Sequence, residues 1–61
     1  MVKIGDRFYD MENGRILTPD GVAGNMWRCF VEKYNPESDR FDDFAGVAFL
    51  TAGELERMEK A

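Results

Sequence analysis

Acidic side chains crowd into one short segment of this chain, and their chemistry is its most suggestive feature. From Glu37 to Asp43 the sequence reads ESDRFDD, in which four carboxylates accompany one arginine, Arg40. The segment therefore carries three of the four units of net negative charge. Grouped carboxylates attract cations or basic protein surfaces and repel phosphates.

Three interpretations fit the acidic segment. The first is an exposed, solvated hairpin end that keeps the protein soluble, which is the usual role of charge runs. The second is a calcium site, but the twelve-residue ligand pattern with a central glycine and a distal glutamate is absent. The third is a binding surface for a basic groove, because aromatic anchors ringed by charge are typical of binding sites. The predicted partner-binding residues are Glu37, Asp39, Phe41, Asp42, Asp43 and Phe44.

The chain lacks the residue combinations of the commonest enzyme sites. It has no histidine, so the commonest general base and the mixed zinc sites are missing. Its one cysteine, Cys29, shares a strand side with Trp27 and Val31, which is typical of a small buried hydrophobe. Paired carboxylates could hydrolyse glycosides, but so short a chain leaves little room for a cleft of roughly 300 Å³. We expect no enzymatic activity, no catalytic residue, no metal and no cofactor.

Two glycines, Gly21 and Gly24, have the spacing of loops that clamp a phosphate backbone. Asp20 precedes them, and no lysine or arginine lies within three residues, so nothing neutralises a phosphate. This glycine pair therefore predicts a flexible turn between strands.

Direct nucleic-acid binding is the competing class of function. Aromatic rings beside cations can stack single-stranded bases, and one predicted strand carries both kinds of side chain. However, the isoelectric point near 4.6 is the reverse of the usual basic footprint. We expect nucleic-acid binding to be disfavoured. The alternative that we keep is a small β-barrel that binds nucleic acid through Trp27, Arg28, Phe30 and Lys33.

Composition predicts one small folded domain covering residues 1–61. Apolar residues make up 44% of the chain and aromatic residues 13%, too many for a disordered segment. Aromatic side chains that stay outside so small a core would form a contact patch or a homodimer interface. One cysteine cannot form an intramolecular disulfide, and no apolar run has the length of a signal peptide or membrane span. We expect a soluble, cytoplasmic protein that does not contact a membrane.

A β-hairpin is predicted over 6–18, with its turn at Asn13-Gly14. A two-residue turn would pair Glu12 with Arg15 and Met11 with Ile16. A glycine-bulge turn would place Asp10 opposite Ile16 instead. We favour the first register for its charge pair and its better apolar matching.

The middle of the chain is predicted as a loop over 19–25, a strand over 26–34 and a turn over 35–39. The strand alternates, and both of its faces are partly apolar. One face would carry Trp27, Cys29 and Val31, and the other Met26, Phe30 and Tyr34.

The last third combines an ambiguous segment with a clear helix start. Residues 40–50 mix helical and strand spacing, and Gly46 favours a strand over roughly the second half. Thr51 and Glu54 form a capping box, which predicts a helix from Ala52 to about Lys60 that offers Leu55 and Met58 to the core. A Glu56–Lys60 pair would support it, and Leu50 would pack on Leu55 as a hydrophobic staple.

These elements predict an α+β domain with three to four antiparallel strands and a short C-terminal helix. An opening such as KIGDRFYD before a hairpin is common in small SH3-like barrels, which makes that barrel one version of the fold. The leading function is a non-enzymatic interaction module. Its concrete version is a regulator or inhibitor of the kind that phages and mobile elements encode, acting on the basic groove of a nucleic-acid-handling protein. A purely structural role and a homodimer are the further alternatives.

Overall fold

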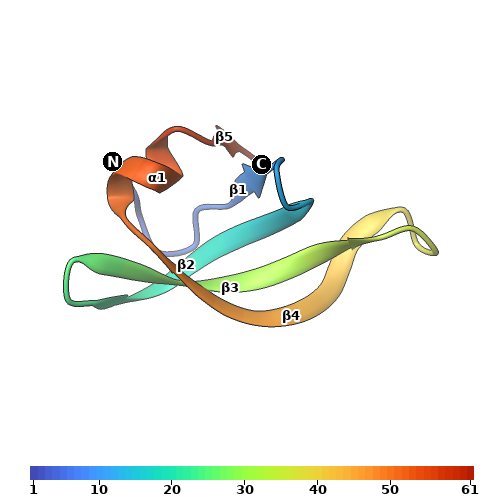
Figure 1. The fold of residues 1–61 in the computed structure, drawn as a ribbon, viewed down its shortest axis with the longest axis horizontal. Coiled ribbons are helices and arrows are strands. Elements are labelled where there is room, and N and C mark those ends of the chain that lie inside the picture. The colour runs from blue at the N-terminus through green and yellow to red at the C-terminus, as the bar shows by residue number, and fades with distance from the viewer.

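The computed structural model describes all 61 residues, which form one antiparallel sheet of five strands and a single short helix. The strand order across the sheet is β4-β3-β2-β1-β5. The expected small antiparallel sheet with a helix near the C-terminus is confirmed, but the sheet has five strands rather than the expected three or four. The fold is mostly β, however, and the sheet does not close into a barrel (Figure 1). The elements are β1 (Phe8–Asp10), β2 (Arg15–Ala23), β3 (Met26–Asn35), β4 (Arg40–Leu50), α1 (Ala52–Glu56) and β5 (Glu59–Lys60).

Strands β2, β3 and β4 form a long, twisted ribbon, and the rest of the chain covers one face of it (Figure 1). Figure 1 shows α1, β1 and β5 on one side of the ribbon made by β2, β3 and β4, with both chain termini on that side. The end of the β3–β4 hairpin extends beyond them, and the molecule measures 36 Å along its longest axis against 20 and 18 Å across. The other face of the ribbon has no covering layer.

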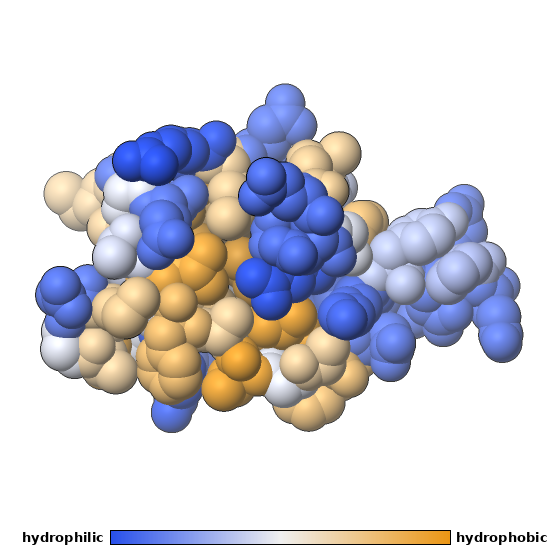
Figure 2. Space-filling view, in the orientation of Figure 1, coloured by the Kyte–Doolittle hydropathy of each residue, from blue (hydrophilic) through white to orange (hydrophobic).

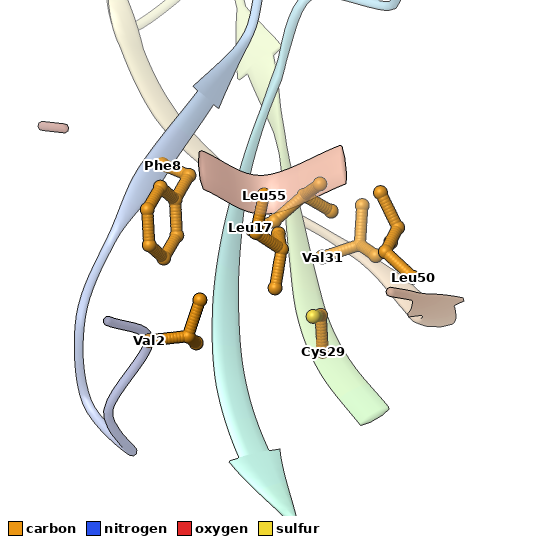
Figure 3. Close-up of a cluster of buried hydrophobic side chains, with 7 residues drawn as sticks. All are labelled: Val2, Phe8, Leu17, Cys29, Val31, Leu50 and Leu55. Atoms are coloured by element: carbon orange, nitrogen blue, oxygen red, sulfur yellow. The ribbon is translucent and has the colours of Figure 1, made fainter. Parts of the chain in front are cut away.

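The hydrophobic core lies between the covered face and α1. Phe8 pairs with Leu17, and Leu17 pairs with Val31, so these side chains form a row across three strands. Leu55 of α1 is fully buried against the core, and burying such a side chain contributes roughly 1.5 to 3 kcal/mol. The cluster drawn in Figure 3 consists of Val2, Phe8, Leu17, Cys29, Val31, Leu50 and Leu55.

The β1–β2 hairpin forms in a third register, so the favoured two-residue turn is wrong. Asp10 pairs with Arg15 and Tyr9 with Ile16, which leaves four residues in the turn. The buried Asp10 carboxylate sets this register, because it accepts hydrogen bonds from Asn13 Nδ2 at 2.9 Å and Arg15 Nε at 2.7 Å. The shift from the favoured register is two residues, so Tyr9 and Ile16 still share a face.

The segment over 19–25 is largely strand, although the sequence predicts a loop. β2 continues to Ala23, with a register shift between Pro19 and Gly21. Pro19 is tolerated because β1 has ended beside it, so no neighbouring strand on that side needs an N–H from residue 19. The carbonyl of Pro19 accepts a hydrogen bond from the N–H of Gly5 at 3.0 Å instead.

β3 matches its prediction closely. Cys29 and Val31 are buried on the core face, where Trp27 also packs, while Phe30 lies on the uncovered face. The predicted turn after β3 is confirmed as well, since Asp39 N donates to Asn35 O at 2.8 Å.

β4 extends over all of its segment rather than the second half alone, and a bulge interrupts it. Between the positions where Val47 and Phe44 pair with β3, β4 has one residue more than its neighbour. Gly46 lies in this bulge with φ of 85°, a backbone conformation that favours glycine. The extra residue puts Phe44 and Val47 on one face although they are three positions apart. This explains the mixture of helical and strand spacing in the sequence.

The helix begins as predicted and ends early. Thr51 and Glu54 form the full capping box, with Glu54 N donating to Thr51 Oγ1 at 3.2 Å and Thr51 N donating to Glu54 Oε1 at 2.9 Å. The predicted Glu56–Lys60 pair is wrong: Glu56 contacts the N-terminal amine at 3.2 Å, and Lys60 contacts Asp6 at 3.3 Å. Lys60 belongs to β5, which pairs with β1. No helix of the structure is long and apolar enough to span a membrane.

Candidate partner-binding surface

The acidic segment forms the outer end of the β3–β4 hairpin. We call this end, residues 36–43, the acidic tip. Its turn is held by the Glu37 N–H, which donates to Asn35 Oδ1 at 3.0 Å, and by a positive φ of 56° at Asp39. Aspartate is among the few residues that adopt this left-handed conformation readily. The tip is therefore a shaped turn with its charges on the outside.

Charges at the tip are only partly compensated. Arg40 Nε lies 4.0 Å from Asp42 Oδ2, the limit of an ion pair, and both side chains are exposed. Hydrogen bonds from Ser38 and Asn35 lower the pKa of Asp42, and the charge of Arg40 adds to this effect. Glu37 and Asp43 take part in none of the ion pairs of the structure.

Asp39 has an aromatic neighbour rather than a cationic one. The hydroxyl of Tyr34 donates a hydrogen bond to Asp39 Oδ1. This hydrogen bond to the carboxylate raises the pKa of Tyr34. The contact ties the tip to β3 and leaves the charge of Asp39 without a counter-ion.

The two predicted aromatic anchors lie in different surroundings. Phe41 packs edge-on between Tyr9 and Tyr34, with ring centroids at 5.7 and 5.5 Å, and is half-buried. Phe44 is 60% exposed and stacks on Phe30 with centroids 4.8 Å apart. Only Phe44 therefore exposes most of its side chain to solvent, whereas Phe41 holds the end of the hairpin against β1.

Phe44 continues into a row of apolar side chains on the uncovered face. Val47 pairs with Phe30, and Phe49 pairs with Arg28, so both lie on the same face as Phe30. They are 53% and 51% exposed. We call Phe30, Phe44, Val47 and Phe49 the apolar stripe. Figure 2 shows orange and tan side chains gathered along the lower margin, over β3 and β4, beside a bluer hairpin end at the right.

Residues of β1, β2 and the acidic tip line an open hollow of about 600 Å³. Two arginines and two aspartates line it, so its charge is balanced, and Ile16 forms part of its floor. A second open hollow, of about 380 Å³, lies between the β1–β2 turn and α1. No group of three or more cysteine, aspartate or glutamate side chains is placed to hold a metal ion. The lining residues of the first hollow are Arg7, Tyr9, Ile16, Asp39, Arg40, Phe41 and Asp42.

The residues of the nucleic-acid alternative do not form one surface. Trp27 packs against the core, while Phe30 lies on the opposite face of β3. Arg28 Nε is paired with Asp20 Oδ1 at 2.8 Å. Lys33 lies directly opposite Asp43 on β4. The predicted stacking platform is thus divided between two faces, and acidic neighbours accompany its cations.

Cys29 is a buried structural residue. Its side chain is fully enclosed in the core cluster, and burial raises the pKa of its thiol to about 11. A thiol that stays protonated is neither a nucleophile nor a metal ligand.

Sequence reasoning misses two of the four residues of the apolar stripe, Val47 and Phe49. The sequence places both residues on a strand but in no site, and it does not indicate the contact of Tyr34 with the tip. The alternation of Val47 and Phe49 was the available signal. It could not be joined to Phe44 because the bulge at Gly46 breaks the alternation.

Comparison of this chain with protein-family models, with curated proteins and with solved structures found no match.

Proposed function

We propose that this chain is a non-enzymatic interaction module that presents the acidic tip and Phe44 to a basic groove on a partner protein. One observation carries this proposal. The tip, with four carboxylates and one arginine, adjoins an aromatic ring that is 60% exposed, at the projecting end of the molecule.

The chemistry of the tip suggests which ligand the partner's groove binds when this chain is absent. A groove that would accept several carboxylates in a row is also suited to the phosphates of a nucleic acid. The chain would then act as a regulator or inhibitor of a nucleic-acid-handling protein, a role that suits a small protein of phages or mobile elements. Carboxylates would govern the rate and specificity of association, and Phe44 would supply a desolvated anchor.

A charge-matched pair of variants tests the role of the tip. Glu37→Gln/Asp43→Asn removes two carboxylates that take part in no ion pair. Glu12→Gln/Glu59→Gln removes two exposed carboxylates elsewhere. Both variants change net charge equally. The wild-type chain first serves as bait to identify the partner, and calorimetry with the purified partner then compares the three proteins.

We expect the tip variant to weaken binding at least tenfold and the control variant to change it less than twofold. Neutralising all four tip carboxylates should abolish binding, and added nucleic acid should displace the chain from its partner. Equal affinities for the tip and control variants would refute the proposal. A change in Trp27 fluorescence on titration with single-stranded DNA or RNA would favour direct nucleic-acid binding instead.

A further inference from the structure

One long edge of the sheet has no strand beside it. β4 is an outermost strand, so the backbone groups along its outer side have no partner within the sheet. The other outermost strand, β5, has only two residues. Unpaired strand edges readily accept another strand, and natural proteins protect them with charges, bulges, prolines or short length.

Protection of β4 is uneven along its length. Its first half carries Asp42 and Asp43, a register shift against β3, and the glycine bulge at Gly46. Its second half, Val47–Leu50, contains no charge, proline or glycine, and its register with β3 is regular. Val47 and Phe49 are both about half exposed there. The unprotected edge and the exposed apolar side chains thus coincide.

We propose that a second copy of this chain pairs antiparallel with β4 over Val47–Phe49, about a two-fold axis at Ala48. Val47 of each copy then lies opposite Phe49 of the other, and both point to the face of the apolar stripe. Pairs of β-branched and aromatic residues are favourable across antiparallel strands. The result is one continuous sheet built from two copies.

Three observations favour a second copy over a foreign strand. The segment is self-complementary in this register, as an isologous two-fold interface requires. Val47 and Phe49 are two positions apart and share a face, so the two-fold axis preserves the faces of the sheet. The like charges of Asp42 and Asp43 lie outside the paired segment and at opposite ends of the dimer.

The proposed interface is small, so the dimer should be weak. A half-exposed phenylalanine offers about 100 Å², so Val47, Phe49 and the strand edge together fall in the class below roughly 1,200 Å². We therefore expect a concentration-dependent dimer rather than an obligate one. The total surface of 4165 Å² is close to the roughly 4,000 Å² expected for a folded monomer of 7.0 kDa, so the single chain is also compact.

Sedimentation equilibrium from about 1 µM to about 1 mM tests the association. We expect the average mass to rise from one chain toward two. Phe49→Asp should raise the dissociation constant at least tenfold, and the equally charged control Val22→Asp, at a position 64% exposed in β2, should change it less than threefold. Circular dichroism verifies that both variants are folded. A wild-type chain that stays monomeric throughout, or a dimer that Phe49→Asp leaves intact, overturns the proposal.

The distance between two spin labels tests the geometry of the dimer. A spin label on Ser38→Cys lies ten positions from Ala48, so strand geometry puts the two labels roughly 50 to 65 Å apart in the dimer. Cys29 stays unlabelled because it is buried. A distance under about 30 Å would place the acidic tips together and overturn this register.

The paired segment contains neither Phe44 nor a residue of the acidic tip, and the dimer would present two acidic tips at opposite ends of one particle. Glu37→Gln/Asp43→Asn should weaken partner binding and leave the dimer intact, because neither residue lies in the paired segment. Either proposal can therefore fail without the other.

Discussion

Phe44 stacks on Phe30 across the β3–β4 pair, with 27° between the ring planes, although Phe44 is itself more than half exposed. The contact turns one side of Phe44 toward the sheet and leaves the other side free. A ring held in this way loses little conformational freedom when a partner covers it. This relationship makes Phe44 well suited to the anchoring role that we propose for it.

Replacing Phe44 should therefore affect binding more than folding. Phe44→Ala loses one aromatic pair, which contributes about 0.5 to 1.5 kcal/mol to the free energy of unfolding. We expect it to weaken partner binding at least tenfold. Chemical denaturation and calorimetry measure the two effects. Phe41→Ala is the comparison, and it should show the opposite balance because Phe41 is half-buried between two tyrosines.

Leu55 should be the most sensitive position of α1. Leu55→Ala leaves a cavity under a helix of five residues, which is too short to persist without docking. We expect the free energy of unfolding to fall by about 2 to 5 kcal/mol. Urea denaturation monitored by circular dichroism measures it. A loss below about 1 kcal/mol would mean that the helix does not contribute to the core.

Acid should weaken the β1–β2 hairpin through Asp10. Burial raises the pKa of this carboxyl, but hydrogen bonds from Asn13 and Arg15 outweigh that effect and lower it below the ordinary value of 3.8. A carboxyl with a lowered pKa stabilises the fold above its unfolded pKa, and this stability is lost as the pH falls through the folded pKa.

The variant Asp10→Asn tests this linkage. It should lower the free energy of unfolding by about 1 to 2 kcal/mol at pH 7, because it loses charge-assisted hydrogen bonds. The difference from wild type should shrink as the pH falls below about 4. Denaturation curves across this range measure it, and a difference independent of pH would contradict the role of the charge.

Gly46 and Gly53 should respond oppositely to alanine. A Cβ at Gly46 would meet no atom within 4 Å. Gly46→Ala should therefore lower the free energy of unfolding only through backbone strain at φ of 85°, by about 1 to 2 kcal/mol. Gly53 lies in α1, where alanine has the better helix propensity and should stabilise by up to about 1 kcal/mol. Thermal unfolding of both variants measures the contrast. Stabilisation by Gly46→Ala would show that the bulge does not need its left-handed conformation.

Cys29 should be unreactive until the protein unfolds. Its thiol is buried, and its pKa of about 11 leaves almost no thiolate at pH 8. We expect negligible reaction with a thiol reagent under native conditions and complete reaction in denaturant. Rapid native labelling at pH 8 would mean that β3 opens readily.

Local chemistry explains which predictions succeeded. The capping box at Thr51, the alternation in β3 and the turn before Asp39 each depend on residues a few positions apart, so the sequence alone determines them. The length of α1 is not determined locally. Glu59 and Lys60, beyond the end of the helix, pair with β1, and a single sequence carries no signal for that distant partner.

The sequence alone determines the position of the acidic segment, because charge and turn chemistry place it at the end of a hairpin. Its surroundings were decided by tertiary structure. The buried Asp10 selected the register of the first hairpin, and the bulge at Gly46 moved Phe44 onto the face of Val47 and Phe49. Strand side chains alternate with a period of two, so one inserted residue changes which side chains share a surface. Composition cannot reveal such an insertion until the strand is paired with its neighbour.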